Sequence, residues 1–244
     1  ICGLQAVPRQ TAFGQLTSVT LAAELRARLL AIADPARAPA MQAYMKSAMP
    51  YMGVASADMR RTSKAVFAGL EYANADDWRT DILAIWRGAH YREEYYAAIE
   101  LAGMRYARPF QRIAALSMYR EMIESGGWWD TTDAIAPYRL WDILEAERDF
   151  MRKTMLLWAK DDNMWVRRSA ILCQLHAKAK MDLDLLYACI EPSIASKEFF
   201  LRKVIGWVLR QYARTDPDEV RRYVAANEER LSPLSKREAM KHLK

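Results

Sequence analysis

Residues 197–213 read KEFFLRKVIGWVLRQYA, a run without proline in which apolar side chains recur at helical spacing. Every fourth position carries a large apolar residue, which defines one face of a helix that must be buried: Phe200, Val204, Val208 and Tyr212. The same period continues through most of the chain, and no segment alternates convincingly between apolar and polar residues as a strand does. We therefore predict an all-α fold.

The remaining sequence divides into helical segments with short connections. The other predicted helices are residues 21–32, 38–49, 58–72, 77–87, 92–106, 110–125, 133–145, 147–160, 164–180, 183–190, 217–227 and 236–243. Residues that break helices stand between them, at Pro35, Pro50, Gly126-Gly127, Asp161-Asp162-Asn163, Pro192, Pro217 and Pro233. No linker separates these segments, so we expect a single domain over residues 1–244.

A weak internal repeat accompanies the helical pattern. Residues 165–168 align with residues 200–203 at an offset of 35, and residues 93–96 align with residues 197–200 at an offset of 104. Helix pairs repeated at such a spacing are typical of HEAT-like solenoids, which curve and offer a concave face. We expect a C-shaped solenoid of this kind with a basic concave face, although chance similarity within a helical bundle gives the same signal.

Charge is distributed unevenly along the 244 residues, whose net charge is +6. Residues 151–244 carry 19 Lys and Arg against 12 Asp and Glu, whereas residues 1–150 carry 17 against 18. A basic half beside a neutral half suggests a polyanionic partner. Charge that serves only solubility is an equally good interpretation of the composition alone.

Several chemistries lack their sequence signatures. The chain has no P-loop, GxGxxG, HExxH or GxSxG motif, and its three histidines and three cysteines (Cys2, Cys173 and Cys189) show no metal-binding spacing. We therefore expect neither a metal nor another cofactor. Reduced thiols and a cytoplasmic protein are the simplest interpretation of the cysteines. Charges interrupt every apolar run well before about 18 residues, so we expect no membrane span.

A second stripe on the predicted helix 197–213 mixes cations with an aromatic residue. It consists of Lys203, Trp207, Arg210 and Arg214. Such a row suits a phosphate backbone, with the tryptophan against a sugar or base. Burial of Trp207 between helices, with the cations fringing it, is the simpler interpretation of the spacing alone.

Residues 126–133, GGWWDTTD, place two tryptophans before two carboxylates. Asp130 can cap the next helix, and Asp133 then lies in its first turn. Capping explains Asp130 but not the tryptophans at a turn. A carboxylate flanked by tryptophans could instead stabilise a cation in a cleft, and the residues alone leave both interpretations open.

Two further places could meet a ligand. Arg167 and Arg168 stand near a helix start, where cations oppose the helix dipole, and a phosphate partner would explain them. Tyr44 and Lys46 precede Pro50 and could face a ligand, although a helix end with an exposed lysine explains them more simply.

Taken together, these motifs resemble the AlkD-type bacterial DNA alkylation repair glycosylases. The resemblance covers roughly residue 38 to the end, and the first 35 residues match poorly. It is carried by Tyr44-Met45-Lys46 with Gly53-Val54, and by residues 128–133, 162–172, 196–210 and 234–239. Two departures, Thr132 in place of an aliphatic residue and Gly126-Gly127 in place of a polar pair, could change which lesions fit.

The resemblance implies an enzyme that excises cationic N3- and N7-alkylated purines, including bulky adducts, from double-stranded DNA without flipping the nucleotide. It implies a catalytic carboxylate at Asp133. The other roles it implies are aromatic contacts to the sugar at Trp129 and Trp207, a phosphate contact at Arg168, a further one at Arg210, and a lesion-facing Tyr44. From the stripe of cations we add Lys203 as a DNA-binding candidate.

We expect a monomer that acts on nucleoid DNA in base excision repair and leaves an abasic site without cutting the strand. The alternative is a non-catalytic HEAT-like scaffold that binds nucleic acid or protein. Asp133 separates the two, because a surface that only binds phosphate gains nothing from a carboxylate facing DNA.

Overall fold

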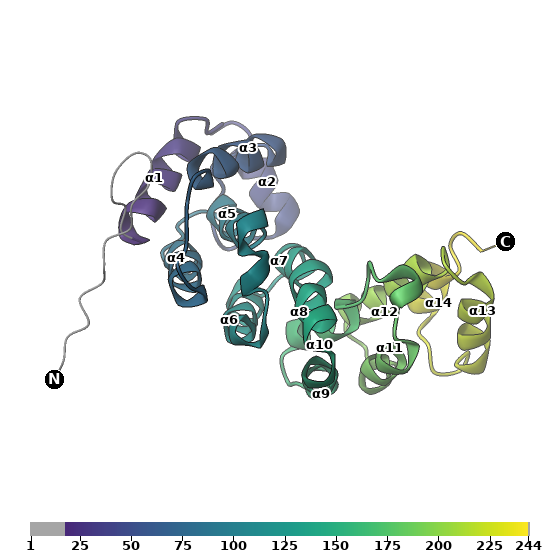
Figure 1. Ribbon diagram of the computed structural model, residues 1–244. Helices are drawn as coiled ribbons and strands as arrows, with labels where there is room; N and C mark the ends of the chain where they lie inside the picture. The colour runs from purple at the N-terminus through teal and green to yellow at the C-terminus, as the bar shows by residue number, and fades with distance from the viewer. Residues whose placement is uncertain (1–17, 244) are drawn as a thin grey trace. The chain divides into compact units, whose positions relative to one another are not determined.

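Helices joined by turns make up the structure, a computed structural model that describes residues 18–243 (Figure 1). This part of the chain contains fourteen α-helices and no strand, which confirms the predicted all-α class. Cys2 lies outside the described residues. None of the described helices is long and apolar enough to cross a membrane. The chain divides into two units, residues 1–110 and residues 111–244.

The first unit packs its helices around large apolar side chains. Its helices are α1 (Ser18–Leu30), α2 (Ala38–Met45), α3 (Ser56–Phe67), α4 (Ala75–Arg87) and α5 (Arg92–Ala102), followed by the 3-10 turn η1 (Arg105–Phe110). Helices α1 and α5 both pack against α4, and α3 packs against α5. Phe67, Trp78 and Ile82 are fully buried at this core.

A buried carboxylate organises the loop between α2 and α3. Glu93 accepts hydrogen bonds from the backbone N–H groups of Met52, Gly53 and Val54, at 3.0–3.1 Å. Gly53 has a φ of +84°, and a Cβ there would lie 2.0 Å from the Asp34 carbonyl oxygen. The glycine of this Gly-Val pair is therefore required by the path of the backbone.

The second unit contains the remaining helices. The α-helices are α6 (Leu116–Gly126), α7 (Trp129–Ile135), α8 (Trp141–Ala146), α9 (Arg148–Trp158), α10 (Met164–Leu172), α11 (Leu183–Ile190), α12 (Phe199–Tyr212), α13 (Pro217–Ala226) and α14 (Pro233–Ala239). Short turns connect them: η2 (Ile113–Ala115), η3 (Ala136–Leu140), η4 (Lys178–Lys180) and η5 (Glu191–Ser193). On α12, Val204 and Val208 are fully buried, as the apolar stripe predicts.

Helix α7 begins four residues earlier than the sequence suggested. Trp128 occupies the cap position, and its carbonyl oxygen accepts hydrogen bonds from the hydroxyls of Thr131 and Thr132, both at 3.0 Å. Asp130 therefore lies in the first turn and is not the cap. A π-helical segment containing Pro137 joins α7 to α8. Asp133 consequently stands one turn inside the helix.

Other helix boundaries also differ from prediction, and the structure explains two of these differences. Helix α10 ends at Leu172 and does not continue to residue 180, because Gln174 exchanges two hydrogen bonds with the backbone of Asp182 and folds the chain back. Helix α14 begins at Pro233, which we expected to break a helix. Proline suits the first position of a helix, and Ser232 caps this one.

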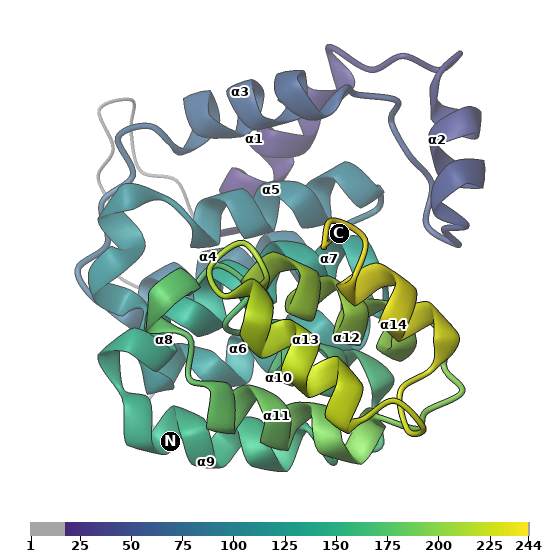
Figure 2. The ribbon, with the colours of Figure 1, turned by 90° about the vertical axis from the view of Figure 1, so that its right-hand side faces the viewer.

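Helices α12 and α14 pack side by side (Figures 1 and 2). Gly206 makes this close approach possible, since a Cβ on it would lie 2.6 Å from the Ser235 carbonyl oxygen and 2.5 Å from the Glu238 Cβ. The Ser235 hydroxyl donates a hydrogen bond of 2.8 Å to the Arg202 carbonyl oxygen. The contact therefore fixes Glu238 beside the face of α12 that carries Trp207.

Candidate active site

The centre of the candidate site is an ion pair between α7 and α10. Arg168 donates two parallel hydrogen bonds to the carboxylate of Asp133, from Nε to Oδ1 and from Nη2 to Oδ2, both at 2.8 Å. The planar guanidinium matches both carboxylate oxygens, so the geometry of the pair is tightly defined. The fold thus brings together two predicted site residues that are 35 positions apart in the sequence.

Burial shapes the electrostatics of this pair. The Arg168 side chain is 4% exposed and that of Asp133 is 15% exposed. Burial raises the pKa of the Asp133 carboxyl above its ordinary value, and the hydrogen bonds and charge of Arg168 oppose that rise. The nearby Asp130 carboxylate adds to the rise. Arg168 is therefore the group that favours the ionised carboxylate.

Arg168 has internal partners where a phosphate was expected. Its third hydrogen bond, from Nη1, goes to the carbonyl oxygen of Phe200 at 2.7 Å. The neighbouring Arg167 donates to the carbonyl oxygens of Asp161 and Asp162, at 2.6 and 3.1 Å. These contacts explain both arginines near a helix start without DNA, and a phosphate contact at Arg168 stays a prediction.

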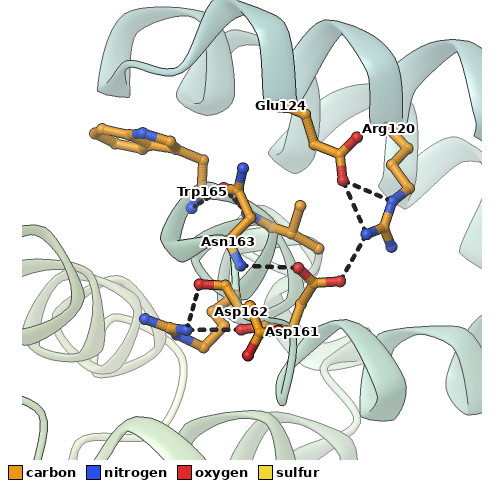
Figure 3. A network of polar contacts seen from close by, with 8 residues as sticks. Arg120, Glu124, Asp161, Asp162, Asn163 and Trp165 are labelled. Carbon is orange, nitrogen blue, oxygen red and sulfur yellow. Dashed lines mark hydrogen bonds and ion pairs between the residues drawn. The ribbon is translucent and has the colours of Figure 1, made fainter.

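The turn before α10 is held by a polar network (Figure 3). The Asn163 side chain caps the helix and accepts from the backbone N–H of Trp165 at 2.8 Å. Asp161 lies between Arg120 and Asn163, accepting from the Arg120 guanidinium at 2.7 Å and from the Asn163 N–H at 2.9 Å. The sequence correctly marked this segment as a turn, and its network fixes the start of the helix that carries Arg168.

The two predicted sugar-facing tryptophans are both partly exposed. Trp129 and Asp133 are four residues apart on α7, so they share one face of the helix. The Trp207 ring lies beside Arg168, whose guanidinium carbon is 5.9 Å from the ring centre. Trp207 is therefore not fully buried between helices, and it lies next to the partner of Asp133.

Trp128, by contrast, is explained by packing. Its ring lies 5.7 Å from that of Trp165 and 5.3 Å from that of Phe200, centre to centre. The rings of Trp165 and Phe200 are 5.0 Å apart. This aromatic cluster connects the turn before α7 with the starts of α10 and α12. Both tryptophans are partly exposed, but Trp128 packs in this aromatic cluster, whereas Trp129 shares a helix face with Asp133.

The predicted DNA-binding cations on α12 share a carboxylate that sequence reasoning missed. Lys203 contacts Glu238 at 2.7 Å between Nζ and Oε1, and Arg210 donates to Glu238 Oε2. Glu238 belongs to the motif of residues 234–239, but its spacing from α12 gave no sign of the contact. The contact is apparent only in the structure, where α14 lies close to α12 at Gly206. The DNA contacts of Lys203 and Arg210 stay predictions.

Tyr44 belongs to the first unit and lies apart in sequence from all the other candidates. Its side chain is highly exposed, at 79%. It stands next to the end of α2, where Lys46 adopts a left-handed conformation with a φ of +49°. The exposed helix end matches the simpler interpretation of this motif, and contact of Tyr44 with a lesion stays a prediction.

The fold and site define an all-helical protein in which a largely buried carboxylate is held by an arginine and accompanied by tryptophans. Its sequence matches the model of the DNA alkylation repair enzyme family over residues 25–243, and the chain belongs to that family. The match begins ahead of residue 38, where the sequence motifs placed the start of the resemblance.

Two solved structures are similar to this chain. A predicted DNA alkylation repair enzyme from Enterococcus faecalis is 30% identical, with a TM-score of 0.77 over 86% of this chain and 96% of the other. The alkylpurine DNA glycosylase AlkC of Pseudomonas fluorescens, bound to DNA containing an abasic site analogue, is 16% identical, with a TM-score of 0.44 over 92% of this chain and 62% of the other. A comparison with curated proteins found no match.

Proposed function

We propose that this protein is a monofunctional DNA glycosylase that hydrolyses the N-glycosidic bond of cationic N3- and N7-alkylated purines in duplex DNA. The observation that carries the proposal is the Asp133 carboxylate, fixed by two hydrogen bonds from Arg168. It shares a helix face with Trp129 and is connected through Arg168 to Trp207. Family membership agrees with this function.

The proposed reaction uses the positive charge of the lesion. The bond between C1′ and the base nitrogen breaks, and its electron pair leaves with the base, which becomes neutral. Positive charge then develops on the deoxyribose as an oxocarbenium ion. A carboxylate held in place stabilises that charge as it forms, and it needs no reorganisation to do so. The faces of Trp129 and Trp207 add cation–π stabilisation.

Water completes the proposed reaction. It attacks C1′ and loses a proton, so that the products are an abasic deoxyribose and a free neutral purine. We propose that Asp133 orients that water and accepts its proton; the 15% exposure of its side chain supports access of water to the carboxylate. No amine nucleophile takes part, so the strand is expected to remain intact.

Selection by the proposed site follows from the charge of the leaving base. Trp129, Trp207 and Asp133 do not form the bidentate pattern that identifies a purine edge. A neutral base leaves readily only with help, such as protonation by a general acid, and an ionised Asp133 cannot be that acid. We therefore infer that lability of the lesion decides what is removed, that base flipping is unnecessary, and that bulky cationic adducts are accepted.

Base release from matched duplexes tests this function. Four otherwise identical duplexes would carry 7-methylguanine, 3-methyladenine, uracil or hypoxanthine. We expect release of the two cationic purines above the spontaneous rate, with intact strands, and no release of uracil or hypoxanthine. Binding without release of any base would support the non-catalytic scaffold instead. Efficient release of uracil or hypoxanthine would show that a base-reading pocket and a general acid exist.

A further inference from the structure

Glu238 holds two cations on the helix face that carries Trp207. One of its carboxylate oxygens binds Lys203 and the other binds Arg210. Along α12, Trp207 stands four residues after Lys203 and three before Arg210, so all three share a face. One carboxylate therefore bridges the cations on either side of the tryptophan.

The backbone around Glu238 keeps this carboxylate in place. Its side chain is 10% exposed, against 39% for Lys203 and 22% for Arg210. The approach of α14 to α12 at Gly206 leaves no room for even one methyl group. Glu238 therefore differs from a surface glutamate, whose backbone and side chain are not held by packing against another helix. This packing fixes the backbone and Cβ of Glu238 beside the two cations.

The charge of this cluster is smaller than its cations suggest. The hydrogen bond from Lys203 and the charges of Lys203 and Arg210 hold the pKa of the Glu238 carboxyl below its ordinary value, so it is ionised at neutral pH. Together with Asp133 and Arg168, the cluster has three cations against two carboxylates, a net charge of +1. A surface built for maximal phosphate affinity would not contain either carboxylate.

We propose that Glu238 competes with DNA phosphates for Lys203 and Arg210 and thereby weakens binding to undamaged duplex. The proposal rests on one part of the proposed function, namely that DNA contacts the face of α12 that carries Trp207. Non-specific affinity comes almost entirely from phosphate contacts. An internal competitor therefore limits the time spent on undamaged DNA, while Trp207 stays in position between the two cations.

Glu238→Gln tests the competition, because glutamine has the same shape and fits the same packing but lacks the charge. The measurement is the affinity for undamaged duplex over a series of salt concentrations. Each new phosphate contact adds about 0.9 to the log–log salt slope, so freeing both cations should steepen the slope by up to about 1.8. Glu229→Gln is the matched control, because it removes the same charge from an exposed residue. It should leave the slope unchanged.

A second variant makes the test independent of how well Glu238→Gln folds. Because Lys203 is withheld by Glu238, Lys203→Met alone should flatten the salt slope by much less than about 0.9. The same change in the Glu238→Gln background should remove about half of the gain. A full effect of Lys203→Met in the otherwise unchanged protein would overturn the proposal.

Weaker or unchanged binding of a folded Glu238→Gln variant, with the slope of the unmodified protein, would also overturn it. Weaker binding would mean that Glu238 presents the cations to DNA, and unchanged binding would mean that it does not compete with phosphate. These binding experiments need no base release. If the protein releases no base but Glu238→Gln steepens the salt slope, only the proposed glycosylase activity is contradicted. If the protein releases bases but Glu238→Gln leaves the slope unchanged, only the proposed competition between Glu238 and phosphate is contradicted.

Discussion

The guanidinium carbon of Arg168 lies 5.9 Å from the centre of the Trp207 ring. The same guanidinium holds both carboxylate oxygens of Asp133 at 2.8 Å. Arg168 therefore connects the candidate carboxylate on α7 with the candidate aromatic side chain on α12. This arrangement makes Arg168 a positioning residue for the proposed chemistry, and its removal has consequences that a lost phosphate contact would not have.

Arg168→Met should shift the acid limb of the pH–rate profile to higher pH. Burial raises the pKa of Asp133, and Arg168 is the main group opposing the rise. Without it the pKa rises further, and the carboxylate that the reaction needs is protonated over a wider range. The measurement is single-turnover release of 7-methylguanine across pH, after subtraction of the spontaneous rate. Arg168→Lys, which keeps the charge, should show a smaller shift.

Arg168→Met should also lose stability as pH rises, because the pKa of Asp133 in the folded variant is raised. A folded-state pKa above the unfolded value of about 3.9 means that the folded form binds the proton more tightly. The contribution of Asp133 to stability is then fully present below pH about 3.9 and is lost as pH rises through the folded-state pKa of Asp133. Thermal unfolding across pH measures this loss. A variant with the acid limb and pH stability of the unmodified protein, but a flatter salt slope, would show that Arg168 acts on phosphate instead.

Trp207→Ala should slow base release more than Trp207→Phe. A ring face near a cation contributes about 0.5–2 kcal/mol, which corresponds to about 2- to 30-fold in rate. Phenylalanine keeps a π-face, whereas alanine has none. Single-turnover rates at saturating enzyme separate this effect from binding. Equal rates for the two variants would indicate that Trp207 acts through its size or its indole N–H.

Helix α12 shows which features of the fold and site could be predicted from the sequence. The spacing of Val204 and Val208 predicted a buried face, because hydrophobic burial imposes a helical period on the residues themselves. The second stripe correctly grouped Lys203, Trp207 and Arg210 on this helix, but its fourth member, Arg214, lies in the turn after α12 ends at Tyr212. Local periodicity therefore predicts which residues share a face, and the sequence resemblance assigned roles to Asp133 and Arg168, which the residues alone had already made candidates.

Partners from distant segments could not be predicted in this way. Nothing in the pattern shows that Arg168 would bind Asp133 or that Glu238 would bind two cations, because these contacts depend on helix packing. The start of α7 was misplaced for a related reason. Asp130 is a good cap by residue type, but the helix begins at Trp129, with Trp128 at the cap position and Asp130 in the first turn.

Gly206→Ala should destabilise the protein although alanine is the better helix former. The propensity gain is about 1 kcal/mol, but the new methyl group would lie 2.6 Å from the Ser235 carbonyl oxygen. Backbone atoms cannot move aside as a flexible side chain can, and overpacking costs about 1–3 kcal/mol. Urea unfolding measures the balance. An unchanged or raised midpoint would show that α14 moves away easily, and Glu238 with it.

Asp133→Asn under single-turnover conditions tests the central claim most directly. Asparagine keeps the shape and one hydrogen-bond acceptor for Arg168 but carries no charge. Asp162→Asn, at an exposed residue, is the matched control. Loss of a stabilising group in the transition state costs about 100- to 1,000-fold in rate. We predict a loss of that size for 7-methylguanine release by Asp133→Asn, with duplex binding retained and the control unaffected. A folded Asp133→Asn variant that releases 7-methylguanine at the rate of the unmodified protein would contradict the account.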